Sequence, residues 1–279
     1  MNIEELLQQT QALPSIPKVV QELIQGLSKD DVLTSEISQQ LAADQVLSAK
    51  VLRLANSAYY NVPRTVSTVD EALKLLGFLT VRTLVMTTGV AGSFQNLQGI
   101  DLKRFWRYSL HTAVAAKYFA RGALLDTELA FTVGLLHGIG RLVMHAGMPE
   151  AMAAASLPAS PFPDAERIAA ERQVFGYSFA DVGAELARRW NFPEVFAEAI
   201  RGAAEPLEKE PVDALHGLVH IAAWCARVEE LQEDLDTRAE SFPDTVADKI
   251  GQPHLRETVF NDMPPIAELA EGLEEMVAN

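Results

Sequence analysis

The chain has 279 residues, of which 48 % are apolar, so it can bury a sizeable core as one large domain or two modest ones. Its net charge is −15, and residues 201–279 carry 6 basic and 18 acidic side chains. That acidity repels phosphate backbones and anionic lipids, and no basic cluster compensates for it, so binding to nucleic acid or to a membrane is disfavoured.

Three features of the chain favour a cytoplasmic protein. No run reaches the roughly 18 apolar residues that a bilayer span needs. Residues 1–5 are acidic and lack the basic-then-apolar order of a signal peptide. The single cysteine, Cys225, cannot form an internal disulfide and is expected to be a small buried hydrophobe.

Apolar residues recur at helical spacing from one end of the chain to the other, and no stretch alternates as a strand does. Three expected helix starts carry a capping-box pattern, at Asn2, Thr68 and Ser178. The sequence predicts helices from Asn2, over residues 19–27, from residue 34 or 35, over 46–56, 68–77, 81–88, 101–120, 126–137, 148–155 and 178–190, and then from Pro193 and Pro211, each in a first turn.

Prolines and glycines divide these helices. Residues 13–17 hold two prolines, and residues 156–163 hold three and are expected to form an exposed loop. Glycines at 89, 92 and 99 mark a break before Asp101. The acidic tail is expected to alternate short helices with breaks at its prolines.

The stretch at residues 135–142 has an unusual composition: two leucines, then His137, Gly138, an isoleucine, Gly140 and Arg141. It resembles the central motif of the HD superfamily of metal-dependent phosphohydrolases, which reads two apolar residues, His, Asp, apolar, Gly, and Lys or Arg. Every position matches except Gly138, which stands where that superfamily has a metal-binding aspartate. We expect a turn at these glycines.

A second resemblance is carried by the order and spacing of several segments, at residues 13–17, 44–60, 72–77, 106–110, 134–137, 182–186 and 190–193. Together they look like the HD-related output domain family, abbreviated HDOD, over residues 13–206. The resemblance implies a helical signalling module that is similar to HD phosphohydrolases in fold but usually lacks their metal site.

From these resemblances we expect an all-α, multi-helix HD-like fold in which an N-terminal helical bundle packs on an HD-related bundle. Residues 1–99 would form the N-terminal sub-domain and residues 100–210 the HD-like core. Residues 211–279 would be an acidic helical extension packed on the HD-like part. Glycine-rich phosphate-binding motifs are missing from the sequence.

The resemblance also traces the expected metal ligands. An HD phosphohydrolase needs several imidazoles and carboxylates around one or two divalent metals, which neutralise phosphate charge and lower the pKa of a bound water. One ligand, His137, survives, and a single imidazole cannot hold a catalytic metal. The other ligand positions of active relatives correspond to Tyr108, Gly138, Phe179, Ala203, Ala204 and Ala223. We expect these residues to surround a vestigial pocket in which Tyr108 is a candidate hydrogen-bond partner of His137.

Other histidines were weighed as ligands. His111 lies one turn from Tyr108 and belongs to the same vestigial pocket; it could substitute as a ligand, but a half-buried helix histidine is commoner. His216 and His220 share a helical face and could bind a metal together. Gly217 stands where a zincin has its glutamate, so an ordinary packed helix is favoured.

The favoured hypothesis is a pseudoenzyme: a non-catalytic HDOD regulatory module, without cofactor or metal, acting through protein contacts in a bacterial signalling pathway. Its expected partners are signalling proteins, with receiver or cyclic-di-nucleotide pathway proteins as candidates, and a homodimer is left open. Two alternatives remain. One is an HD-type phosphohydrolase with non-standard ligands, and the other is a sensor that binds a nucleotide or metabolite in the vestigial pocket.

Overall fold

The computed structural model describes residues 1–8, 34–57, 62–77, 97–155, 165–190 and 192–273, with isolated residues or pairs at 80–81, 84–85, 87–88, 94, 157 and 277. This described part is helical and contains no strand, so the all-α fold class is confirmed. Its α-helices are α1 (Ile3–Gln8), α3 (Thr34–Ala43), α4 (Gln45–Ala55), α5 (Val69–Leu76), α7 (Leu102–Gly122), α8 (Thr127–Leu136), α9 (Ile139–Gly147), α10 (Pro149–Ala154), α11 (Ala165–Phe175), α12 (Phe179–Arg189), α13 (Glu194–Ala204), α14 (Ala214–Glu230), α15 (Leu235–Ser241), α16 (Asp244–Lys249), α17 (Leu255–Glu257) and α18 (Ile266–Leu269).

Side-chain caps start several helices where the sequence predicted them. The Glu5 N–H donates to the Asn2 side-chain oxygen across 2.8 Å, and the Asn2 N–H donates to the Glu5 carboxylate across 3.0 Å. Thr68 caps α5 by accepting from the Glu71 N–H, and Ser178 forms a full capping box at α12. Each cap satisfies a backbone N–H group that the first helical turn leaves without an internal partner.

Two helices were not predicted from the sequence, and both omissions have a physical cause. Residues 137 and 138 form the turn that the sequence predicts at this motif, and α9 begins directly after it at Ile139. Because glycine is a poor helix former, Gly140 concealed this helix in the sequence. The buried face of α11 consists of Ile168 with the charged pair Arg167 and Glu171, so it shows no apolar periodicity.

The expected positions of two prolines need correction. Pro193 is the N-cap of α13 rather than a first-turn residue. Pro211 lies outside α14, which begins at Ala214. The Asp213 carboxylate caps this helix by accepting hydrogen bonds from the N–H groups of Leu215 and His216. An acidic N-cap is the stronger helix-start signal of the two.

Three further predictions fall wholly or partly outside the described residues. They are the proline-interrupted stretch at 13–17, the helix at 19–27 and most of the loop at 156–163. Of the helix predicted at 81–88, the described residues are helical.

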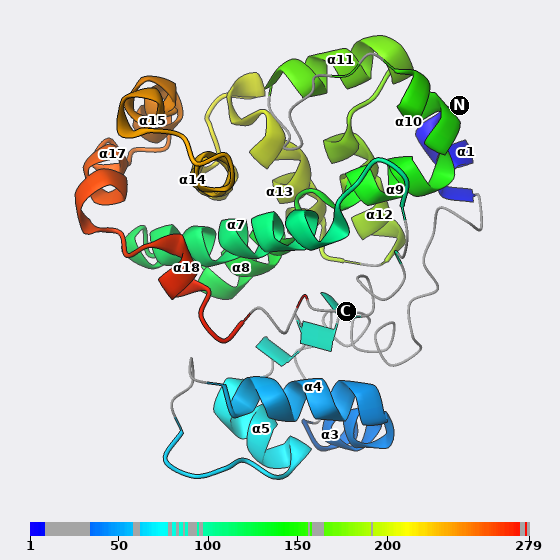
Figure 1. The fold of residues 1–279 in the computed structure, drawn as a ribbon, viewed down its shortest axis with the longest axis vertical. Coiled ribbons are helices and arrows are strands. Elements are labelled where there is room, and N and C mark those ends of the chain that lie inside the picture. The colour runs from blue at the N-terminus through cyan, green and yellow to red at the C-terminus, as the bar shows by residue number, and fades with distance from the viewer. Residues whose placement is uncertain are drawn as a thin grey trace.

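Helix α7 is the central element, packed along α8 on one side and α14 on another (Figure 1). Helices α3, α4 and α5 pack together as a small group beside the larger helical body. Helix α1 lies against α9 and α12, so the chain returns its first residues to the larger body. The proposed boundaries at 99 and 210 remain a prediction.

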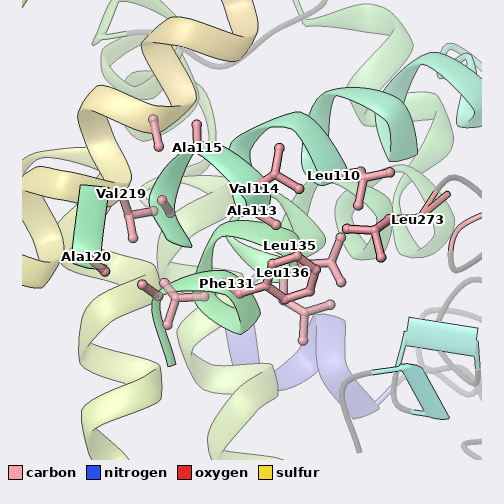
Figure 2. Packing of buried hydrophobic residues seen from close by; sticks show 14 of the residues in the cluster. Leu110, Ala113, Val114, Ala115, Ala120, Phe131, Leu135, Leu136, Val219 and Leu273 are labelled. Carbon is pink, nitrogen blue, oxygen red and sulfur yellow. The ribbon is translucent and has the colours of Figure 1, made fainter. Parts of the chain in front are cut away.

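Small residues bring α7 and α8 into close contact. Figure 2 shows Leu110, Ala113 and Val114 of α7 and Phe131 and Leu135 of α8 in the buried cluster around this contact. At Gly134, an added methyl group would lie 2.8 Å from the Ala113 Cα atom, which is too close for a side chain. The absence of a side chain there lets the two backbones approach directly.

A second close approach joins α9 to α12. A methyl group on Gly140 would overlap the carbonyl oxygen of Phe179 and lie 2.7 Å from the Gly183 nitrogen. Both neighbours are backbone atoms in helical positions and cannot rotate away. Gly140 therefore determines how near α12, and with it Phe179, lies to the residues around His137.

Among the described residues, one segment, Thr127–Gly147, is long and apolar enough to cross a membrane by length and composition alone. It comprises α8, the turn and α9, and 83 % of its most apolar window is buried inside the protein. Its apolar character therefore serves the core between α7 and α12.

We predict that Gly140→Ala lowers the free energy of unfolding by more than about 2 kcal/mol, because the added methyl group forces α9 and α12 apart. Gly122→Ala is the matched control, since nothing lies within 4 Å of its added methyl group. Urea denaturation followed by far-ultraviolet circular dichroism measures both. Equal stability of the two variants would contradict the close approach.

Candidate functional site

A cavity of about 220 Å³ lies where α7, α8, α11, α12, α13 and α14 converge, closed on one side by Ser241 and Pro243. Six of the eight residues predicted for the vestigial pocket line it: Tyr108, His137, Phe179, Ala203, Ala204 and Ala223. Residues that were not predicted for it also contribute: Ala165, Ile168, His220, Trp224, Arg227, Ser241 and Pro243. The fold thus brings together, around one small space, side chains that are as far apart in the sequence as Tyr108 and Pro243.

His137 ends α8 and is buried in the cavity wall. Its Nδ1 donates a hydrogen bond of 2.6 Å to the Gly134 carbonyl oxygen, which places the proton on that nitrogen. Nε2 is then the acceptor, and the Tyr108 hydroxyl donates to it across 3.3 Å. The expected partner is therefore present, and the ring nitrogen that could have bound a metal is occupied.

Burial keeps the His137 ring neutral. Desolvation lowers its pKa to about 4, against the opposing effect of the Gly134 carbonyl, and the charge of Arg141 contributes further lowering. A neutral ring bonded at both nitrogens has no unsatisfied polar atom, which is the condition for burying an imidazole at low cost.

Phe179 is held in the wall by a buried ion pair. The Glu171 carboxylate accepts a 2.7 Å hydrogen bond from the Phe179 N–H and a 2.9 Å bond from Arg167 Nε. Burial raises the pKa of Glu171, while Arg167 and the Phe179 N–H oppose that rise by favouring the charged form. Glu171 thus fixes the first turn of α12 and the position of Phe179 in the cavity wall.

The donor atoms around the cavity do not fit a catalytic divalent metal. Among the described residues no aspartate or glutamate lines the cavity, and no group of three or more histidine, cysteine or acidic residues is placed to hold a metal ion. The cavity instead contains the positive charge of Arg227. Mg²⁺ and Mn²⁺ require oxygen ligands, so this lining disfavours both ions.

Two predicted pocket residues lie elsewhere. His111 is directed to the α7–α14 contact, where its Nδ1 lies 3.8 Å from the Glu230 carboxylate. At Gly138, an added methyl group would lie 3.3 Å from the Phe105 ring, and neither Gly138 nor His111 lines the cavity.

His216 and His220 contact different parts of the protein. His220 lines the cavity, and its Nδ1 donates a 2.9 Å hydrogen bond to the Ala203 carbonyl oxygen. His216 lies against Gly202 and lines a separate surface hollow, with its Nε2 3.8 Å from Asp213. Burial lowers the pKa of both histidines. The two rings therefore line different spaces, which agrees with the favoured assignment as packed helix residues.

Arg227 was not predicted to line the cavity, although the spacing of residues on α14 carries a signal for it. His220, Ala223, Trp224 and Arg227 are spaced i, i+3, i+4 and i+7, so they share one face of α14. A test for residues that continue the face of His220 would have found the arginine.

Comparison with known proteins identifies the family. The sequence matches the model of the HDOD domain over residues 13–206. The chain belongs to the HDOD family. A candidate phosphohydrolase from Shewanella amazonensis, solved by crystallography, is 31 % identical with a TM-score of 0.77 and covers 98 % of both chains.

Two further relatives of this HDOD chain have a lower sequence identity. An HDOD domain protein of unknown function from Geobacter sulfurreducens is 23 % identical with a TM-score of 0.71, covering 99 % of this chain and 94 % of that one. An uncharacterised protein of Treponema pallidum is 27 % identical over 204 residues, which are 68 % of this chain. The matched segment spans 37 % of that relative's length.

We predict that His137 makes the stability of this HDOD chain depend on pH. An imidazole with a pKa of about 6.5 when unfolded and about 4 when folded is protonated first in the unfolded chain as pH falls. The neutral His137 ring therefore contributes fully to the free energy of unfolding above about pH 6.5, and this contribution is lost as the pH falls towards about 4. Between about pH 7.5 and 4.5 the loss is about 2.5 kcal/mol.

Urea denaturation at those two pH values checks this prediction. The change in unfolding free energy between the two pH values should be about 2.5 kcal/mol smaller in His137→Gln than in the unmodified protein. The exposed control His254→Gln should show the same change as the unmodified protein. An unchanged difference in His137→Gln would show that the buried ring is not neutral.

Proposed function

We propose that this chain is a non-catalytic HDOD regulatory module that acts through protein contacts in a signalling pathway of the bacterial cytoplasm. The observation that carries the proposal is the cavity at the HD-like motif. Its helical frame is complete, but its described lining has no carboxylate and its histidine is neutral and hydrogen-bonded at both nitrogens. A phosphohydrolase would need metal ligands at this place.

Relatives support a role in signalling. A candidate signal transduction protein from Marinobacter aquaeolei shares the fold, with 23 % identity and a TM-score of 0.64 over 91 % of this chain. This chain covers 61 % of that protein. Membership of the HDOD family supports the same role.

The proposed partners are other signalling proteins, with receiver or cyclic-di-nucleotide pathway proteins as candidates and a second copy of the chain as an alternative. The concentration of 18 acidic side chains in residues 201–279 favours protein contacts over nucleic acid or anionic lipid. No cofactor is proposed. The proposal of protein partners is tested by capturing proteins from an extract of the native cell on the tagged full chain. A column that carries an unrelated acidic protein is the control.

A metal-dependent phosphohydrolase is the second candidate function. It is favoured by the candidate phosphohydrolase of Shewanella amazonensis, which is similar to this chain over nearly its whole length. The lining of the cavity opposes it, because two neutral histidines and one arginine supply too few ligands and the wrong charge for a divalent ion.

We predict that the purified protein hydrolyses neither phosphomonoesters, cyclic nucleotides nor cyclic di-nucleotides in the presence of Mn²⁺, Mg²⁺ or Fe²⁺. The assay measures released phosphate or nucleotide, with an active HD phosphohydrolase as the positive control. His137→Ala should be indistinguishable from the unmodified protein. Turnover that co-purifies with the chain and disappears in His137→Ala would establish the phosphohydrolase instead.

We also predict that restoring the aspartate of the HD motif does not restore activity. In Gly138→Asp the first carbon of the new side chain lies 3.3 Å from the Phe105 ring, and the carboxylate beyond it loses hydration without gaining a metal, so stability should fall by about 1–3 kcal/mol. Gly138→Ala is the matched control, because it adds the same first carbon without the charge. Stoichiometric metal in Gly138→Asp, measured by elemental analysis, would contradict the prediction.

A further inference from the structure

Arg227 is the unusual residue of the cavity. It lies in the last turns of α14, its side chain is half-buried, and its Nε atom is fully buried without a hydrogen-bond partner in the part of the chain that the structure describes. A buried guanidinium N–H with no acceptor costs more than an ordinary lost hydrogen bond because the group is charged. A water molecule in the cavity does not reach this Nε, so a ligand there would bind the other guanidinium nitrogens, which form no hydrogen bond or ion pair with the described residues.

Neighbouring arginines have carboxylate partners, which sets Arg227 apart. On the outer side of α14, Arg107 binds Glu230 through two hydrogen bonds of 2.5 Å. Arg238 of α15 lies 3.3 Å from Glu229 and also donates to backbone carbonyls. Arg227 lines the cavity, whose described wall contains no acidic side chain.

The rest of the wall combines one hydroxyl donor with apolar surface. Ser241 Oγ accepts a 3.2 Å hydrogen bond from Trp224 Nε1, so its own proton can be donated to another group. His220 uses Nδ1 to bind the Ala203 carbonyl, which leaves Nε2 as an acceptor in the neutral ring. Apolar side chains complete the lining: Ile168, Phe179, Ala203, Ala204, Trp224 and Pro243.

We propose that this cavity binds a small organic anion, with its carboxylate or phosphoryl group on Arg227 and its apolar body between Phe179 and Trp224. Arginine suits either head group because its planar N–H donors match two anionic oxygens at once. The volume of about 220 Å³ is below the range of about 300–1,000 Å³ of pockets that enclose drug-sized ligands, so a cyclic di-nucleotide is too large to be enclosed.

Binding would connect parts of the chain that are distant in sequence. The walls come from α7 and α8 on one side, α11 to α13 on another, and α14 with Ser241 and Pro243 on the third. A ligand bound to Arg227 would hold α14 against these helices and stabilise the folded state. This site goes beyond the protein contacts proposed above and does not depend on them.

The test uses the full chain and three anionic probes: benzoate, phenyl phosphate and inorganic phosphate. Benzamide is the neutral control, because it has the size and shape of benzoate without the charge. We expect saturable binding of benzoate or phenyl phosphate with a dissociation constant on the order of 1 mM or below, as is usual for ligands of this size. The comparison of the two identifies the head group.

Two measurements locate the binding. The ligand should raise the melting temperature, and it should change the fluorescence of Trp224, an effect that disappears in Trp224→Phe while Trp106 and Trp190 remain. Benzamide and inorganic phosphate should bind more weakly, since each lacks one of the two recognised parts.

Variants decide whether Arg227 is the anion-binding group. Arg227→Gln should weaken binding by about tenfold or more, the usual loss for a charged hydrogen bond. Arg121→Gln is the matched control, because that side chain is exposed and lies outside the cavity wall. Should Arg227→Gln fail to fold, Ala204→Phe serves instead, because a phenyl ring added to this lining residue on α13 would occupy cavity space and should abolish binding.

Three results would overturn the proposal. They are no saturable binding of any anionic probe up to about 10 mM, equal binding of benzoate and benzamide, and unchanged affinity in the folded Arg227→Gln or Ala204→Phe variant. Weakened binding in these variants together with unchanged binding in Arg121→Gln supports it.

Discussion

The architecture around His137 depends on backbone contacts at two glycines, one on each side of the histidine. Gly134 lets α8 touch α7 at Ala113, and Gly140 lets α9 touch α12 at Phe179. A side chain at either position would separate a helix pair, because the opposing atoms belong to backbones that cannot rotate away. The relative positions of Tyr108, His137 and Phe179 follow from these two contacts, so the pocket is a consequence of how closely four helices pack.

The same frame can host metal chemistry or exclude it, depending on which side chains it carries. Here an aromatic ring, alanines and an arginine line the cavity, and its described wall has none of the carboxylates that Mg²⁺ or Mn²⁺ would require. The remaining histidine completes its hydrogen bonds with a carbonyl and a hydroxyl, and burial holds it neutral. The frame is conserved in shape between this chain and a candidate phosphohydrolase, and the chemistry of the cavity is decided by a few side chains.

Buried charges in this protein fall into two kinds. Glu171 satisfies both its oxygens, one on Arg167 and one on the first N–H of α12, so its charge contributes to positioning a helix. Arg227 has no such partner within the described chain and borders empty space. A charge that is fully hydrogen-bonded supports the fold, whereas a charge beside a cavity marks a place where a ligand would supply the missing partner.

The sequence by itself determined the helical class and most helix starts, because caps and apolar spacing are local features. It did not predict α9, in which Gly140 allows close packing on α12. Nor did it predict α11, whose buried face combines Ile168 with the ion pair of Arg167 and Glu171. Only the tertiary structure decided that His111 belongs to the Glu230 contact and that Arg227 enters the cavity. Spacing along a helix gives the direction of a side chain, but the partner it meets depends on helices that are far away in sequence.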